Sequence, residues 1–134
     1  MENTNQILNE RGFITLEYKR QKGYQLGFLN EIELEKALVE QPLYKALATI
    51  IDADLIDYVD LNEEICLIVD EEGLLKSGNL VYEIRFEGHT HHIAGKFAIG
   101  RNEESMEGLK TVTLLVSDYE KLQSLTWSVV GQVR

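Results

Sequence analysis

The chain is poor in cysteine, in proline and in long apolar runs, and these shortages exclude whole classes of protein. Of its 134 residues, one is Cys and one is Pro. A single thiol cannot build a disulfide framework or a cysteine-based zinc site within one chain. No apolar run reaches the roughly 18 residues that a membrane-spanning helix needs. We therefore expect neither a disulfide-rich secreted protein nor a membrane-spanning one.

The first residues, Met-Glu-Asn-Thr-Asn-Gln, also lack the basic and then apolar pattern of a signal peptide. We therefore expect a cytoplasmic protein. Hydrophobic residues make up 44% of the chain, which is too much for a disordered protein. The length is typical of one domain, so we expect a single domain over residues 1–134 with a polar N-terminal arm over residues 1–10.

Basic side chains are scarce: 13 Lys and Arg stand against 23 Asp and Glu, a formal net charge of -10. A nucleic-acid-binding protein needs a basic surface to neutralise phosphates, so we expect no direct nucleic-acid binding. The one basic run, Lys19 to Lys22, is short and is typical of a solvated turn.

The negative charge is concentrated in one segment. Between Asp52 and Glu72 the chain has nine acidic residues and no Lys or Arg. We predict that these side chains form an acidic interaction face for a protein partner with a basic surface. Its residues are Asp52, Asp54, Asp57, Asp60, Glu63, Glu64, Asp70, Glu71 and Glu72.

Strand-like and helix-like periodicities are both present. Residues 13–18 and 24–29 are predicted strands joined by a turn, and Leu43, Ala46, Leu47 and Ile50 have helical spacing that predicts a helix over 42–51. A strand over 55–61 and the apolar run 65–69, which is typical of a strand buried on both faces, would form a hairpin. This arrangement would place Asp52 and Asp54 at the same end as the acidic residues 70–72.

The C-terminal half predicts more strands. They cover 81–86, 93–99 with a bulge at Gly95, 111–116 and 127–130, with a polar loop over 100–110. Ser117 begins a capping-box pattern that predicts a helix over 118–125. Segment 32–40 fits helix and strand equally. The fold class is α+β: a single sheet-dominated domain with a mixed, mostly antiparallel sheet and two main helices (about 42–51 and 118–125).

Residues 43–100 resemble the family called domain of unknown function 3846, which is found in phages and mobile elements. The resemblance implies a setting in bacteria, phages or plasmids and no particular chemistry. The matching residues are Leu43, Leu47, Ile56, Val59, Leu61, the segment 68–76 (Ile-Val-Asp-Glu-Glu-Gly-Leu-Leu-Lys), Asn79 and the segment 93–99 (Ile-Ala-Gly-Lys-Phe-Ala-Ile).

All three histidines of the chain lie close together, at His89, His91 and His92. On a continuing strand His89 and His91 would share a face with Glu87, and two imidazoles with one carboxylate are a possible zinc ligand set. The alternative is a solvated polar turn after Gly88. We favour the turn and expect no bound cofactor.

No complete catalytic constellation is present. Cys66 lies inside an apolar run and is typical of an inert buried thiol. We therefore favour a non-enzymatic binding or regulatory protein. The alternatives are a metal-dependent or acid–base enzyme with a site around His89–His92, and a DNA-mimic inhibitor of a host defence nuclease. A homodimer that pairs through a sheet edge is also compatible with the sequence.

Overall fold

The structure is a computed structural model that describes residues 12–30, 43–105 and 108–134. Strands dominate these ranges and two α-helices complete them, which confirms the sheet-dominated α+β class. The strands form two sheets rather than one, and every described pairing is antiparallel. The predicted arm over residues 1–10 and the ambiguous segment 32–40 lie outside the described residues.

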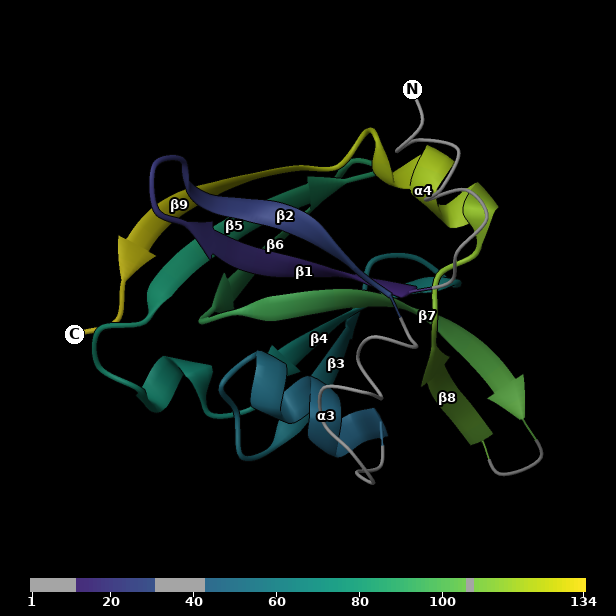
Figure 1. Cartoon of the computed structure of the whole chain (residues 1–134), viewed down its shortest axis with the longest axis horizontal. Helices are drawn as coiled ribbons and strands as arrows, with labels where there is room; N and C mark the ends of the chain where they lie inside the picture. Colours follow the sequence, from purple (N-terminus) through teal and green to yellow (C-terminus); the bar gives the residue numbers. More distant parts are fainter. Residues whose placement is uncertain (1–11, 31–42, 106–107) are drawn as a thin grey trace.

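The larger sheet has six strands in the order β2-β1-β7-β4-β3, and β8 pairs with β7. In Figure 1, β7 lies between the β1–β2 hairpin and the β3–β4 hairpin. It pairs with β1 and with β4 and so joins the two hairpins into one sheet. The strands are β1 (Gly12–Lys19), β2 (Gly23–Asn30), β3 (Ile56–Asp60), β4 (Ile65–Asp70), β7 (Phe97–Ser105) and β8 (Gly108–Val112).

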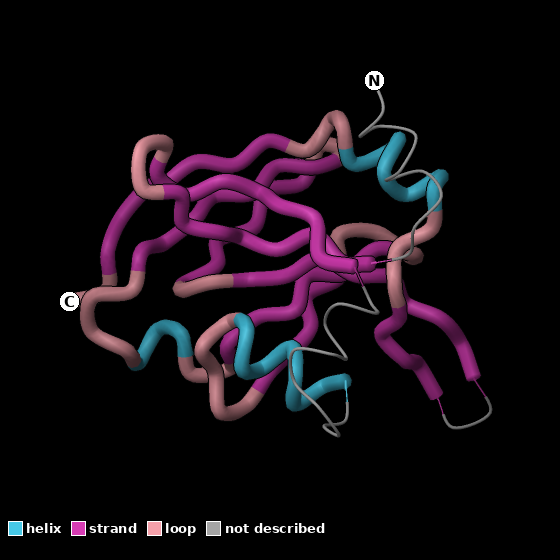
Figure 2. The backbone as a smooth tube through the Cα atoms, in the orientation of Figure 1, coloured by secondary structure: helices cyan, strands magenta, loops and turns pink. Residues whose placement is uncertain are grey.

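The smaller sheet has the order β6-β5-β9 and packs against one face of the larger sheet. Its strands are β5 (Leu80–Phe86), β6 (His89–Ala94) and β9 (Thr126–Gln132). Tyr82, Ile84 and Phe86 of β5 alternate inward, as predicted, and are almost fully buried between the sheets. Figure 2 shows that strands make up most of the backbone around this core.

Strand β4 lies between β7 and β3 in the larger sheet, and all six of its residues are buried. Leu67 and Val69 pack into the core between the two sheets, whereas Ile68 packs on the opposite face. That face is covered by helix α3 (Leu43–Ile50), whose Leu47 is 1% exposed. The predictions of a helix near 42–51 and of a strand buried on both faces are confirmed.

The predicted single strand over 93–99 is wrong, because the chain turns at Gly95. This residue has φ +90°, a conformation that favours glycine, so β6 ends at Ala94 and β7 begins at Phe97. A Cβ atom at Gly95 would also lie 3.0 Å from Asn79 Nδ2. Apolar residues continue on both sides of the turn because both strand ends are buried.

The predicted polar loop over 100–110 is also wrong. Strand β7 continues to Ser105 and pairs with β8, and this hairpin projects from the body of the molecule in Figures 1 and 2. The sequence of this segment is mostly polar and lacks the apolar alternation that would predict a strand. The strand predicted over 111–116 corresponds to β8, which begins at Gly108 and ends at Val112.

The second helix, α4 (Val116–Leu122), begins and ends earlier than the predicted 118–125. Leu115, not Ser117, is the N-cap residue, and its backbone N–H donates to the Asp118 carboxylate at 2.7 Å. The other carboxylate oxygen accepts a hydrogen bond from Arg101 on β7, also at 2.7 Å. Asp118 is fully buried, so this paired carboxylate fastens α4 to the larger sheet.

The chain passes very close to itself at the short 3₁₀ helix η1 (Gly73–Leu75). A Cβ atom at Gly73 would overlap the carbonyl oxygen of Ala94. We expect Gly73→Ala to lower the free energy of unfolding by about 2 kcal/mol, because η1 and β6 must separate. Urea denaturation measures this loss.

Gly131→Ala is the matched control for this substitution. The nearest atom to a Cβ at Gly131 would be the Cβ of Val81, at 4.0 Å, which is an ordinary contact. The control should therefore lose much less stability than Gly73→Ala. Equal unfolding midpoints for the two variants would contradict the close approach at η1.

Candidate functional site

The acidic segment forms one edge of the larger sheet. It comprises the loop after α3, the β3–β4 hairpin and the turn that leads into η1. The backbone N–H of Glu71 donates to the Leu55 carbonyl at 3.0 Å, so the two ends of the hairpin meet. The expectation that Asp52 and Asp54 lie at the same end as residues 70–72 therefore agrees with the structure.

Three of the nine carboxylates are neutralised by basic residues from elsewhere in the chain. Asp70 pairs with Lys76 at 2.6 Å, and Asp52 pairs with Lys96 at 2.7 Å. Glu64 pairs with Lys121 at 3.0 Å, and Arg101 lies 3.6 Å from the same oxygen. The sequence segment contains no cation, but the fold supplies several, so the exposed negative charge is smaller than the sequence suggested.

Lys76 lies at the centre of the acidic end of the hairpin. Its ammonium group bonds to the Asp70 carboxylate and also donates to the Asp52 carbonyl at 3.0 Å. The hydrogen bond to Asp70 raises the pKa of Lys76 above its ordinary value of 10.5, with further contributions from Asp54 and Glu72. A divalent cation at this end would have to displace the ammonium group.

Six carboxylates of the segment form no ion pair with any described basic side chain. They lie on or near β3, which is an edge strand among the described strands of the larger sheet. Asp57 and Asp60 are on opposite faces of this strand, so the charge follows an edge rather than covering one face. We call this group the acidic edge: Asp54, Asp57, Asp60, Glu63, Glu71 and Glu72.

Large apolar side chains accompany the acidic edge. Tyr58 is 44% exposed on β3, and Leu55 is 55% exposed just before it. Leu74 and Leu75 of η1, a few residues after Glu72, are 74% and 80% exposed. Exposed apolar side chains bordered by charged ones resemble the apolar core and polar rim of a protein–protein interface.

The histidine cluster lies on β6, but the structure does not assemble the predicted ligand set. Glu87 and Gly88 have φ of 49° and 79° and form the tight turn between β5 and β6. Glu87 therefore lies in the turn and accepts a long hydrogen bond from Asn62. Within residues 12–30, 43–105 and 108–134, no three His, Cys, Asp or Glu side chains are grouped to hold a metal ion.

The three histidines face different surroundings. His92 is exposed and lies 3.8 Å from Glu83, whereas His91 is half-buried on the inner side of the sheet. The Nε2 atom of His91 is buried and makes no hydrogen bond to any described residue. Cys66, in the middle of β4, is fully buried, as expected from the apolar run around it.

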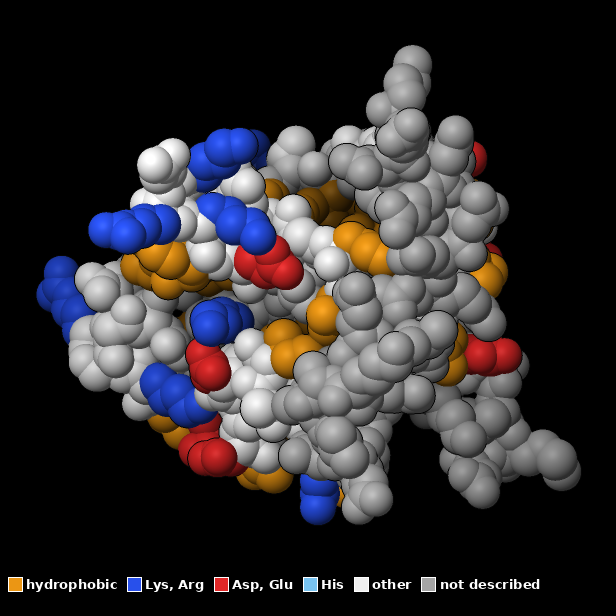
Figure 3. Space-filling model, viewed as in Figure 1, with side chains coloured by type: hydrophobic (Ala, Val, Ile, Leu, Met, Phe, Trp, Pro, Cys, Tyr) orange, Lys and Arg blue, Asp and Glu red, His pale blue; other side chains and the backbone are white. Residues whose placement is uncertain are grey.

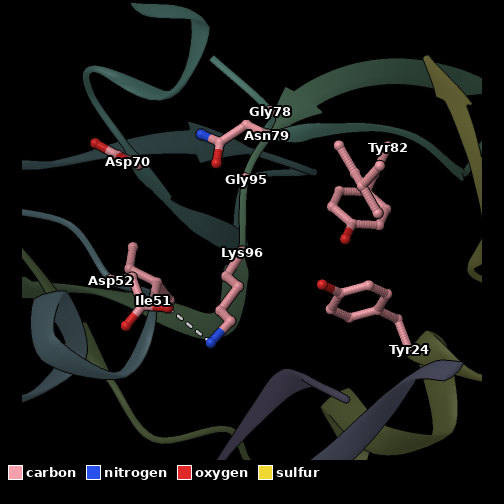
Figure 4. A pocket seen from close by; sticks show the side chains of 10 residues that line it. Tyr24, Ile51, Asp52, Asp70, Gly78, Asn79, Tyr82, Gly95 and Lys96 are labelled. Atoms are coloured by element: carbon pink, nitrogen blue, oxygen red, sulfur yellow. Dashed lines mark ion pairs between the residues drawn. The ribbon is translucent and has the colours of Figure 1, made fainter. Parts of the chain in front are cut away.

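A polar cavity of about 210 Å³ lies where the β6–β7 turn approaches β2 and β5. Figure 4 shows that the hydroxyl groups of Tyr24 and Tyr82 point toward one another across it, while Lys96 pairs with Asp52. Asp70 and Asn79 also line the cavity. No sequence pattern predicts this site, because its walls come from five separate segments.

Tyr82 is the most buried polar side chain of the cavity, with 2% of its surface exposed. Burial, and secondarily the nearby Tyr24, raise the pKa of Tyr82 to about 12. Its ring packs against Tyr24, Phe97 and Trp127, so the hydroxyl is held in position by an aromatic cluster. At neutral pH this hydroxyl is protonated and can donate a hydrogen bond.

Several residues that carry the family resemblance meet beside this cavity. Asn79 Nδ2 donates to the Gly73 carbonyl at 2.9 Å, and Gly95 packs against the same amide. The backbone N–H of Gly95 donates to the Leu80 carbonyl at 2.9 Å. These motif residues therefore hold η1 and the β6–β7 turn together and shape one wall of the cavity.

The fold is that of a two-sheet antiparallel α+β protein with an acidic edge and a polar cavity. A family model described as "Domain of unknown function (DUF3846)" matches residues 28–125, nearly three quarters of the chain. The chain therefore belongs to this family, and the match extends the resemblance over 43–100 in both directions. No curated protein and no solved structure matches the chain. Among the described helices, none has the length and apolar character to cross a membrane.

The pairing of Glu64 with Lys121 can be tested by titration. The hydrogen bond from Lys121 lowers the pKa of Glu64 below its ordinary value of 4.5, so this ion pair stabilises the fold above that pH and is lost as pH falls. In Lys121→Gln we expect the pKa of Glu64 to rise, while Arg101 continues to lower it to a lesser degree. NMR of the Glu64 carboxyl carbon across pH measures the change.

Lys45→Gln is the control for this titration. It removes the same charge from an exposed position on α3 and should leave the pKa of Glu64 unchanged. A Glu64 pKa that is the same in both variants would show that the ion pair does not form in solution.

Proposed function

We propose that the protein is a non-enzymatic binding or regulatory protein whose acidic edge engages a protein partner with a basic surface. The observation that carries this proposal is the placement of six carboxylates without described basic partners on β3, an edge strand among the described strands of the larger sheet, and in the turns beside the β3–β4 hairpin. Three other carboxylates of the same segment are neutralised by the fold itself. Among the described residues of the acidic segment, the carboxylates without a basic partner therefore lie on β3 and in the turns beside the β3–β4 hairpin.

The backbone of β3 adds a second means of recognition. No described strand pairs with the outer side of β3. We propose that its N–H and C=O groups on that side pair with a strand of the partner. Charged side chains on an edge strand repel an identical edge, which disfavours a homodimer through β3. The same carboxylates attract an extended basic segment, so charge selects the partner while the backbone supplies hydrogen bonds.

The alternatives receive less support from the geometry. A DNA mimic should approach the charge density of a duplex, roughly ten charges over the roughly 17 Å length of a five-residue strand. The acidic edge has six carboxylates, and they are spread over both faces of β3 and the adjoining turns. An enzyme built around His89 and His91 would need Glu87 beside them, and Glu87 lies in the turn.

The family resemblance also suggests a setting. We propose that the protein acts in the cytoplasm of bacteria that carry a phage, a plasmid or another mobile genetic element. A basic partner in that setting would include the DNA-handling proteins of the host or of the element, since their surfaces are basic.

Neutralising the acidic edge should weaken partner binding. The variant Asp54→Asn/Asp57→Asn/Asp60→Asn removes three charges with almost no change in side-chain volume. In affinity capture from a lysate of the organism that encodes the chain, we expect it to retain about 10-fold less partner than the unmodified protein. Capture by the unmodified protein should also fall as sodium chloride is raised from about 50 to about 500 mM.

A second triple variant controls for net charge. Glu87→Gln/Glu103→Gln/Glu120→Gln removes the same number of charges from exposed positions outside the acidic edge. It should capture as much partner as the unmodified protein. Equal losses in both variants, or capture that does not depend on salt, would refute recognition by the acidic edge.

A further inference from the structure

We propose that the cavity lined by Tyr24, Tyr82, Asn79 and Lys96 is a binding site for a small oxyanion, a phosphate or carboxylate group. This site is separate from the acidic edge in residues and in charge. It lies where the β1–β2 hairpin, η1 and the β6–β7 turn converge, between the two sheets. The proposal therefore does not depend on the proposed function.

The two tyrosine hydroxyls point to a ligand. Tyr82 is 2% exposed, and it lines the cavity together with Tyr24. A tyrosine hydroxyl that faces a cavity can donate a hydrogen bond to water or to a ligand there. Figure 4 shows the Tyr24 and Tyr82 hydroxyls pointing toward one another, so one ligand oxygen beside them can accept from both.

Both carboxylates that line the cavity accept hydrogen bonds from lysine side chains. The Asp70 carboxylate accepts from Lys76 at 2.6 Å and from the Glu72 backbone N–H at 2.9 Å. The Asp52 carboxylate accepts from Lys96 at 2.7 Å. The two tyrosine O–H groups and the other N–H bonds of the Lys96 ammonium group are further donors at the cavity. A donor-rich cavity favours a ligand with charged acceptor oxygens.

The surrounding charge also favours an anion. Tyr24 follows the β1–β2 turn directly, and Lys19, Arg20 and Lys22 of that turn are all exposed. Lys19 pairs with Glu17 at 3.0 Å, while Arg20 and Lys22 have no carboxylate partner within the described residues. Figure 3 shows Lys and Arg side chains gathered at this end of the molecule. A positive surplus beside the cavity, in a chain of net charge -10, attracts anions to this one place.

The cavity volume limits the size of the ligand. At about 210 Å³ the cavity is smaller than the roughly 300–1,000 Å³ of sites for drug-sized molecules. It therefore suits an inorganic anion or one charged group of a small metabolite. The Asn79 amide nitrogen is held by the Gly73 carbonyl, so its oxygen is left to accept from a hydroxyl of such a ligand.

The test is an NMR titration of the ¹⁵N-labelled full chain with sodium phosphate and, separately, sodium malonate, at ionic strength held constant with sodium chloride. We expect saturable shifts of the amides of Tyr24, Asn79, Gly95 and Lys96. Tyr82→Phe and Tyr24→Phe each remove one hydroxyl and keep the ring, and each should weaken binding about 10-fold or more. Tyr58→Phe, at the exposed tyrosine of β3, should bind as the unmodified protein does.

Each outcome decides the question. Binding of either anion that is weakened by the cavity variants supports the site, and the tighter of the two identifies whether phosphate or carboxylate is preferred. No saturable shift with either anion at 20-fold excess over about 1 mM protein, or shifts that persist unchanged in Tyr24→Phe and Tyr82→Phe, would overturn it. If the amide spectrum of Tyr82→Phe shows an unfolded chain, binding by Tyr24→Phe alone decides, because Tyr24 is less buried.

Discussion

Both the acidic edge and the polar cavity depend on the ion pair between Lys76 and Asp70. Asp70 ends the buried strand β4 and is itself buried, so its charge requires a partner. Lys76 supplies that partner and also binds the Asp52 carbonyl, which ties η1 to the loop before β3. Without Lys76, the buried Asp70 carboxylate would lose its ion-pair partner, and Lys96, which pairs with Asp52, would be the described cation left at this end of the hairpin. Asp70 also lines the cavity, and Lys76 interacts electrostatically with Asp54 and Glu72 of the acidic edge, so the pair adjoins both regions.

The sequence predicted the secondary structure correctly where its apolar residues fit a helix or a strand but not both. The helical spacing of Leu43, Ala46 and Leu47 and the apolar run of β4 each match one period, and both elements form as predicted. The errors lie where tertiary structure overrides the local pattern. The turn at Gly95 lies between two buried, apolar strand ends, and the sequence of the β7–β8 hairpin is mostly polar and lacks strand alternation. At α4 the buried Asp118, rather than Ser117, determines where the helix begins.

The sequence predicted only part of the candidate site, because residues far apart in the chain come together there. A run of acidic residues is visible in one segment, and it does form a sheet edge. The cations that neutralise part of it, Lys96 and Lys121, lie far along the chain and reach the edge only through the fold. The cavity is still less visible, because Tyr24 and Tyr82 become neighbours only when the N-terminal hairpin packs against β5. Family membership adds no activity to these residues, so their geometry carries the functional argument.

Amide hydrogen exchange of the full chain, with and without the partner that it captures, tests the central claim most directly. If the acidic edge is the interface, exchange should slow in β3 and in the turns at its two ends, while the outer strands of the smaller sheet, β6 and β9, should be unchanged. Slowed exchange in β6 or β9 with no change in β3 would contradict the account.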